Sequence, residues 1–179
     1  MPLLYPTLAT VAILRLAELV HGRRNAARLL VRGGQEVGAA HYPLFILLHG
    51  GWFVAIAAFA EREPRWPALL ALFGLLQVAR WWVIWSLGPY WTTRIITMAG
   101  TPLVRRGPYR WLRHPNYLIV AAEIAVLPSA FGAVWLAVVF SLLNAALLSH
   151  RIGVENGALT TRRHLDGSAS ARHSSARLD

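Results

Sequence analysis

Cysteine and lysine are both absent from this 179-residue sequence, and only 15% of its residues are charged. Without cysteine the chain has no disulfide, no zinc–thiolate site, no iron–sulfur cluster and no cysteine nucleophile. Soluble domains average about 25% charged and about 45–50% apolar residues. Here 56% of the residues are hydrophobic and the mean hydropathy is +0.44. These values argue against a soluble globular protein and indicate a polytopic membrane protein.

The net charge of +10 comes from 18 arginines against eight acidic residues. In a soluble protein such an excess is typical of nucleic-acid binding, because phosphates require a basic face. Here the arginines gather between apolar stretches, which is the arrangement that sets the orientation of membrane proteins. We therefore expect membrane lipids, and no nucleic acid, among the partners.

Four apolar stretches predict membrane-spanning helices, since about 20 apolar residues cross a bilayer. They cover residues 3–20, 42–60, 66–87 and 115–149. The last stretch has Pro128 and Gly132 near its middle and leaves two alternatives. A single helix would be about 50 Å long against a hydrocarbon core of about 30 Å, whereas two helices of about 16 and 18 residues would each be slightly short.

The arginines favour the two-helix alternative and hence five spans. With five spans, residues 21–40, residues 92–113 and the segment after His150 share one side, which holds 14 of the 18 arginines. The other side holds only Arg62 and Arg65, whereas four spans would move the five tail arginines there. Because positive segments stay in the cytoplasm, we expect an all-α integral membrane protein of the inner membrane. It has about five transmembrane helices, its N-terminus outside and its C-terminus in the cytoplasm.

These features predict a single membrane-embedded domain over residues 1–160. Residues 1–90 hold three spans, and residues 91–160 hold a polar connection followed by the helical hairpin. Residues 161–179 are rich in serine, alanine and arginine and poor in apolar residues, so we expect a basic, disordered tail.

Several polar side chains fall inside the spans, within about 12 Å of the cytoplasmic ends of their helices. They are Arg15, Glu18, His49, Arg80, Glu123 and Asn144. Snorkelling to the interface and local pairing explain the two arginines about as well as a functional role does. Glu123 and His49 reach the interface less easily, and ionisable groups inside a bilayer mark functional sites. We therefore expect Glu123 and His49 to bind a substrate in a polar pocket that opens to the cytoplasm.

The segment before the fourth apolar stretch, residues 103–117, concentrates arginine, aromatic residues and proline. Pro115 suits the first turn of a helix, whose free N–H groups attract an anionic group. On composition alone, a basic interfacial loop with aromatic anchors is the favoured alternative. His114, His150 and His164 lack the carboxylate or thiol spacing of a zinc site, so we expect no metal.

One set of residues resembles the isoprenylcysteine carboxyl methyltransferase family over about residues 95–160. The set consists of Leu103, Val104, Gly107, Tyr109, Arg113-His114-Pro115 and Tyr117, followed by Arg151, Gly153, Glu155 and Leu159. Members of that family are integral membrane enzymes that use S-adenosylmethionine. The resemblance implies a cofactor site made of Thr101, Pro102, Leu103, Val104, Tyr109, His114, Pro115, Asn116, Tyr117 and Glu155. It also implies catalytic roles for Arg151 and Glu155, with Arg151 facing the acceptor.

The N-terminal half is similar to a bacterial branch of this family that O-methylates alkylpyrones or alkylresorcinols. The similarity rests on Glu18-Leu19, Arg24-Asn25, residues 33–36, His41-Tyr42-Pro43 and His49. It implies an O-methyltransferase with a lipid-like acceptor and an active site that faces the cytoplasm. Two alternatives remain: carboxyl methylation of a prenylated cysteine, and a non-catalytic membrane adaptor whose arginines bind anionic lipid.

Overall fold

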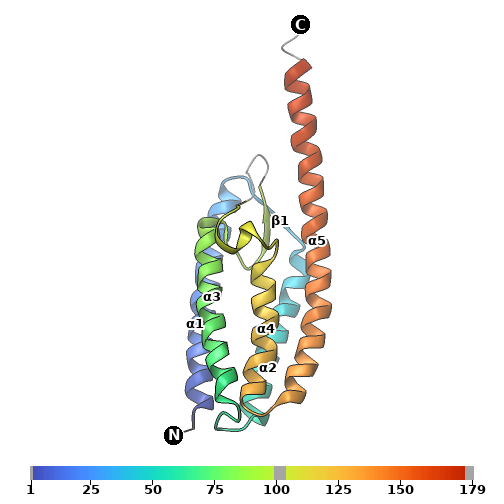
Figure 1. Cartoon of the computed structure of the whole chain (residues 1–179). Coiled ribbons are helices and arrows are strands. Elements are labelled where there is room, and N and C mark those ends of the chain that lie inside the picture. Colours follow the sequence, from blue (N-terminus) through green and yellow to red (C-terminus); the bar gives the residue numbers. More distant parts are fainter. Residues whose placement is uncertain (1, 99–103, 176–179) are drawn as a thin grey trace.

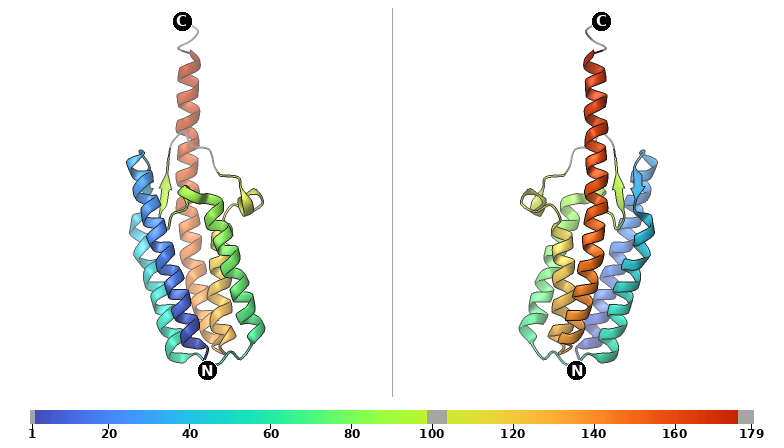
Figure 2. Two further views of the ribbon diagram at one scale, coloured as in Figure 1. Left: turned by 90° about the vertical axis from the view of Figure 1, so that its left-hand side faces the viewer. Right: turned by 90° about the vertical axis from the view of Figure 1, so that its right-hand side faces the viewer.

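The computed structural model describes the backbone of residues 2–98 and 104–175, and the side chains of these residues up to residue 158. Its long helices form one bundle in which successive helices run antiparallel (Figure 1). They are α1 (Leu4–Val31), α2 (Tyr42–Phe59), α3 (Pro67–Leu87), α4 (Pro115–Ala130) and α5 (Val134–Ser175). The N-terminus lies at one end of the bundle and the C-terminal part of α5 projects from the other end (Figure 2).

The described helices confirm an all-α integral membrane protein. α1, α2, α3 and α5 contain stretches long and apolar enough to cross a membrane, and α4 is a shorter apolar helix of 16 residues. The apolar stretch 115–149 forms a hairpin, as predicted, and the chain turns at residues 131–133. Gly132 has a φ of +77°, and a Cβ atom there would lie 2.5 Å from Glu61 Oε1, so the turn requires glycine.

Two helices are longer than the sequence predicts. α1 continues through the expected loop to Val31, because alanine, leucine and arginine favour helix and because Asn25, Ala26 and Leu29 are buried. α5 continues to Ser175, where a disordered tail is expected from residue 161. Extending an existing helix avoids the cost of nucleation, so a polar segment that follows a long helix continues it more easily than it starts one.

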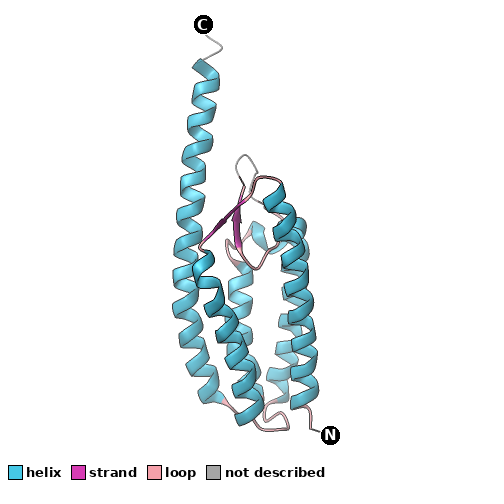
Figure 3. Ribbon diagram, turned by 180° about the vertical axis from the view of Figure 1, so that it is seen from behind, coloured by secondary structure: helices cyan, strands magenta, loops and turns pink. Residues whose placement is uncertain are grey.

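Short elements join the helices at the end of the bundle from which α5 projects. Strand β1 (Gln35–Val37) pairs antiparallel with strand β2 (Ile95–Thr97) (Figure 3). This strand pair was not predicted from the sequence. There are also 3₁₀ turns at this end. Turn η1 (Ala39–His41) precedes α2, η2 (Gly88–Tyr90) follows α3, and η3 (Gly107–Arg110) lies in the segment before α4.

The hydrophobic core occupies the opposite end of the bundle, near the N-terminus. Its fully buried side chains come from four helices and the 131–133 turn, and include Leu4, Ile56, Ile124, Leu127 and Phe131. Backbone hydrogen bonds tie the turns together there, with Leu4 N donating to Arg62 O and Glu61 N donating to Phe131 O. Large apolar residues such as Leu47, Leu75 and Leu142 point outward, as expected for helices that face lipid.

Candidate active site

Side chains from two segments that lie far apart in the sequence meet where α4 begins and α5 leaves the bundle. The Tyr117 hydroxyl donates to Glu155 Oε2 at 2.7 Å and accepts from Arg151 Nε at 2.9 Å. Because α4 and α5 form an antiparallel hairpin, the first turn of α4 lies beside the part of α5 that carries Arg151 and Glu155. The two segments of the family resemblance therefore come together in one cluster.

The Arg151 guanidinium lies near two aromatic rings and donates hydrogen bonds from two of its nitrogens. Its Cζ atom lies 5.2 Å from the centre of the Phe45 ring and 5.7 Å from the centre of the Tyr117 ring. Its Nη2 donates to the Thr93 carbonyl at 2.9 Å. Among the described residues, none accepts a hydrogen bond from Nη1. A buried, oriented guanidinium with a donor to spare is suited to an anionic oxygen of a ligand.

The first turn of α4 supplies an aromatic surface and an acceptor atom. The His114 ring stacks on the Tyr117 ring with centres 5.3 Å apart, and His114 Nδ1 lies 3.7 Å from Glu155 Oε2. Pro115 stands at the start of α4, and the neighbouring Asn116 has a buried Oδ1 with no hydrogen-bond partner among the described residues. An unpaired buried carbonyl is costly unless a ligand or water donates to it.

Tyr109 lies on η3, half-buried, and completes the described part of the predicted cofactor site. Burial raises the pKa of its hydroxyl, and the negative charge of Glu155 raises the pKa further, so the phenol stays protonated. Gly107, at the start of η3, has a φ of +51° and lies against Ser86 and Trp82, so η3 requires glycine there. Val104 is half-buried, and Thr101, Pro102 and Leu103 lie outside the described residues.

Residues of the N-terminal half that pack around Arg151 were not predicted from the sequence. Phe45 lies against its guanidinium, and the Tyr42 and Thr93 hydroxyls are 3.2 Å apart. The buried Asn25 side chain donates to Gly88 O at 3.1 Å and to Trp91 O at 2.9 Å, which holds the chain just before Thr93. The His41-Tyr42-Pro43 motif was the available signal for this region, but nothing in the sequence singles out Phe45.

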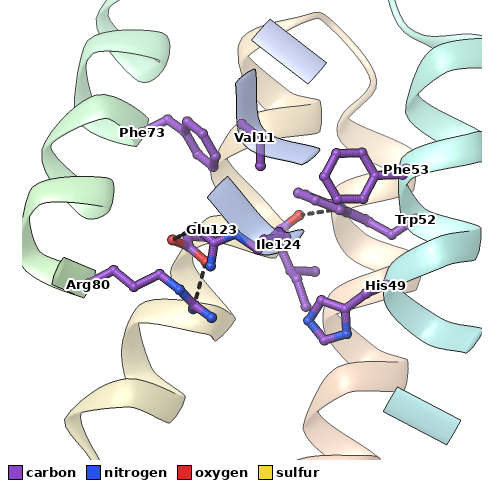
Figure 4. Close-up of a pocket in the computed structure, with 9 residues that line it drawn as sticks. Val11, His49, Trp52, Phe53, Phe73, Arg80, Glu123 and Ile124 are labelled. Atoms are coloured by element: carbon purple, nitrogen blue, oxygen red, sulfur yellow. Dashed lines mark hydrogen bonds and ion pairs between the residues drawn. The ribbon is translucent and has the colours of Figure 1, made fainter. Parts of the chain in front are cut away.

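Glu123 and His49 are not part of this cluster. Glu123 lies deeper in the bundle, where Oε2 is 3.1 Å from Arg80 Nη1 and Oε1 accepts from Gln77 Nε2 at 2.8 Å (Figure 4). The His49 ring points toward the same region, and its Nδ1 lies 2.8 Å from the Phe45 carbonyl of its own helix. Glu123 and His49 line a cavity of about 30 Å³, which has room for water rather than for a substrate. Their role in substrate binding stays a prediction.

Arg15, Glu18, Gln77, Arg80 and Glu123 form one buried ion cluster. Arg80 Nη2 lies 2.8 Å from Glu18 Oε2, and Arg15 Nη1 lies 2.9 Å from the same oxygen. Arg15 also donates to Gln77 and lies 3.5 Å from Glu123. Two guanidinium groups therefore face two carboxylates, and the cluster is neutral. Arg80 pairs inside the bundle instead of snorkelling.

The three residues of the cluster, Tyr117, Arg151 and Glu155, fall inside a region shared with a known family. The model of the isoprenylcysteine carboxyl methyltransferase (ICMT) family matches residues 69–161, from early α3 to the part of α5 beyond Glu155. The uncharacterized protein YpbQ of Bacillus subtilis (strain 168) is 36% identical over 157 residues, which covers 85% of this chain and 94% of that protein. No solved structure matches the chain.

Proposed function

The chain belongs to the isoprenylcysteine carboxyl methyltransferase family, and from this we propose that it is an integral membrane O-methyltransferase with a lipid-like acceptor. S-Adenosylmethionine is the methyl donor in this proposal. The observation that carries it is the cluster of Arg151, Tyr117 and Glu155, in which the two segments of the resemblance share hydrogen bonds. The cluster combines a fixed cation, a fixed carboxylate and an aromatic surface, and methyl transfer uses all three.

The residues present fit the proposed cofactor. The unpaired Asn116 Oδ1 and the Glu155 oxygen not bonded to Tyr117 are acceptors for its ammonium or hydroxyl groups. The positive end of the α4 helix dipole suits its carboxylate, and Tyr109 and the stacked His114 and Tyr117 rings suit its adenine. When bound, S-adenosylmethionine supplies an electrophilic methyl group on a sulfonium centre.

The side chains of this site have the task of alignment. Methyl transfer is an in-line displacement in which the acceptor oxygen forms a bond to the methyl carbon while the carbon–sulfur bond breaks. We assign Arg151 to orient an anionic acceptor oxygen through Nη1, while Tyr117 and Thr93 hold its guanidinium in place. Proximity and orientation of this kind contribute several kcal/mol to a displacement, roughly 7–11 in well-oriented cases. An acceptor that arrives as an anion needs no strong base.

The acceptor we propose is an alkylpyrone or alkylresorcinol, with its ring at Arg151 and its tail in lipid. Support comes from α2, because Tyr42 and Phe45 contribute to the wall around Arg151 and belong to the N-terminal half that is similar to the polyketide-methylating branch. An enol or phenol ring is acidic enough to present an anionic oxygen. The proposed site lies at the arginine-rich end of the bundle, so we place it in the cytoplasm, with the protein in the inner membrane.

The test uses the purified protein in nanodiscs with S-adenosylmethionine labelled on its methyl group. An alkylpyrone, an alkylresorcinol and a farnesylcysteine analogue are offered in parallel. We expect label on the polyketide ring oxygen. Label on the farnesylcysteine carboxylate would retain the methyl transfer and refute the proposed acceptor. If S-adenosylmethionine failed to bind at all, the adaptor alternative would replace the enzymatic one.

A further inference from the structure

The surface of the bundle has a groove between α1 and α3. A groove of about 310 Å³ runs between them near the N-terminal ends of both helices. Its walls include Pro6, Thr10 and Leu14 of α1 and Leu70, Gly74 and Gln77 of α3. Pro6, Thr10 and Gly74 are exposed, so the groove opens sideways toward the surroundings of the bundle. In a membrane those surroundings are the hydrocarbon chains of one leaflet.

The groove offers apolar surface and few free polar groups. Thr7 and Thr10 donate their hydroxyl protons to the carbonyls of Leu3 and Pro6 within the same helix, at 2.7 and 2.8 Å. The Gln77 amide, at the inner end, is bonded to Arg15 and Glu123. A polar ligand would find few hydrogen-bond partners in this groove, whereas an alkyl chain has no hydrogen bonds to lose when it enters the groove.

The length of the groove corresponds to a chain from one leaflet. Pro6 and Leu14 are eight residues apart on α1, which is about 12 Å along a helix, and half of the hydrocarbon core is about 15 Å. The ion cluster of Arg15, Gln77 and Glu123 closes the inner end and separates the groove from Arg151. The groove lies near the N-terminal ends of α1 and α3, whereas the candidate active site lies at the other end of the bundle, from which α5 projects. An acceptor whose ring lies at Arg151 therefore does not place its tail here.

A cationic side chain stands at the outer end of the groove. Arg62 accepts the Leu4 N–H at its carbonyl, next to the start of α1, and its guanidinium lies 5.4 Å from the Tyr5 ring centre. Among the described residues no carboxylate pairs with Arg62, whereas its neighbour Arg65 pairs with Glu61. An exposed guanidinium at a membrane surface attracts phosphate.

We propose that the groove between α1 and α3 binds one acyl chain of a bilayer phospholipid, whose phosphate contacts Arg62. The lipid comes from the leaflet that surrounds the N-terminal ends of the two helices. It fills the gap in the bundle and covers the Arg15–Gln77 edge of the ion cluster. This site is independent of methyl transfer, so its test does not depend on the enzyme's activity.

A larger side chain at Gly74 tests whether lipid binds in the groove, because no atom lies within 4 Å of a Cβ built at this position. Because Gly74 lines the groove and the space around its Cβ position is open, we expect the leucine side chain of Gly74→Leu to extend into the groove. Gly50→Leu is the matched control, since Gly50 also lies exposed inside an apolar helix with open space around its Cβ, but on α2 and outside the groove. The two variants change helix propensity equally.

The measurement is native mass spectrometry of the full chain released from membranes containing phosphatidylglycerol. We expect retained phospholipid on the wild type and on Gly50→Leu, and its loss in Gly74→Leu. Arg62→Gln lowers retention about fivefold, the contribution of one arginine at an anionic surface. Equal retention by Gly74→Leu and Gly50→Leu, or no retention by the wild type, refutes the proposal.

A second measurement needs no variant. Phosphatidylglycerol with a diazirine near the middle of one acyl chain is photolysed with the wild-type protein in nanodiscs, and labelled peptides are sequenced. We expect label within residues 6–14 and 70–77 above that on the outward faces of α2 and α5. Equal labelling of all lipid-facing helices overturns the proposal. Displacement of the label by excess alkylresorcinol also overturns it, because the groove would then belong to the acceptor.

Discussion

Tyr117 is the residue through which the candidate site is assembled. Its hydroxyl oxygen accepts a hydrogen bond from Arg151 and donates one to Glu155, and its ring lies near both the Arg151 guanidinium and the His114 ring. A single phenol therefore sets the positions of a cation on one side and an anion on the other. The ring packs against His114, whereas the hydroxyl forms the hydrogen bonds to Arg151 and Glu155. A substitution that removes only the hydroxyl therefore tests the hydrogen bonds alone.

We expect Tyr117→Phe to fold normally and to lose about 10- to 100-fold in kcat/KM, because hydrogen bonds to charged groups are each worth about 1.5–3 kcal/mol. The phenyl ring keeps the stacking on His114 while Arg151 loses the partner of its Nε. The measurement is methyl transfer from labelled S-adenosylmethionine. Tyr90→Phe, which removes an exposed hydroxyl on η2, is the control and should retain activity. Unchanged kinetics in Tyr117→Phe would show that the cluster does not take part in the reaction.

Glu155→Gln tests the cofactor assignment separately from turnover. The amide keeps the shape of the side chain but removes the negative charge, so we expect the Kd for S-adenosylmethionine to rise about tenfold, which corresponds to about 1.4 kcal/mol. Isothermal titration calorimetry in detergent gives the value. Glu63→Gln, an equal change on the exposed turn between α2 and α3, should leave the Kd as it is. A Kd in Glu155→Gln equal to that of the wild type would contradict the assignment.

At the scale of the elements, the ion cluster fixes α1, α3 and α4 against one another. Arg80 is 8% exposed and bonds to Glu18 on α1 and to Glu123 on α4. Glu123 is 6% exposed and has partners on α3 and α1. Helices in a membrane gain little from hydrophobic association, because lipid is as apolar as their side chains. Polar contacts of this kind therefore determine which helices are neighbours and in which register.

Removing one partner of a buried ion pair leaves the other charge without compensation. We expect Arg80→Gln to destabilise the fold by about 3–5 kcal/mol, because Glu18 and Glu123 then lose their shared cation. Thermal unfolding in detergent, followed by tryptophan fluorescence, measures the effect. Arg65→Gln breaks an exposed pair with Glu61 and should cost about 0–1 kcal/mol. Similar losses in the two variants would refute a stabilising role for the cluster.

The helices and strands also show which parts of the fold and of the candidate site the sequence predicts. Apolar length and the Pro128–Gly132 interruption predict the spans and the α4–α5 hairpin, and the His114–Tyr117 and Arg151–Glu155 segments predict two sides of the site. Periodicity carries no information about β1–β2 pairing or about the contact of Phe45 with Arg151, because both depend on how distant segments pack. A sequence also does not reveal that Arg80, 43 residues before Glu123, is its hydrogen-bond partner.

At the scale of the whole molecule, the odd number of helices in the bundle places the two termini at opposite ends. The candidate site and the arginine-rich connections lie at the end from which α5 projects, and the hydrophobic core lies at the other end. Orientation in the membrane therefore decides which compartment supplies the cofactor.

The absence of cysteine makes this orientation simple to measure, because any introduced thiol is unique. We expect a membrane-impermeant maleimide to label Glu63→Cys in intact spheroplasts, since the proposed orientation places this turn outside. Arg105→Cys, on the exposed segment before η3, should react only after permeabilisation. The reverse pattern would place the candidate site outside the cytoplasm.

The ion cluster also bears on how the chain is inserted during its synthesis. Arg15 and Glu18 emerge together on α1, one turn apart, and neutralise each other. When α3 follows, Arg80 finds Glu18 already in the bilayer, and when α4 follows, Glu123 finds Arg80, Arg15 and Gln77. An unpaired charge at the centre of a helix costs about 2.5–3.5 kcal/mol on insertion. In this chain α3 and α4, the later helices that carry charges of the cluster, each meet a counter-charge on a helix inserted earlier, so the order of translation is also the order of neutralisation.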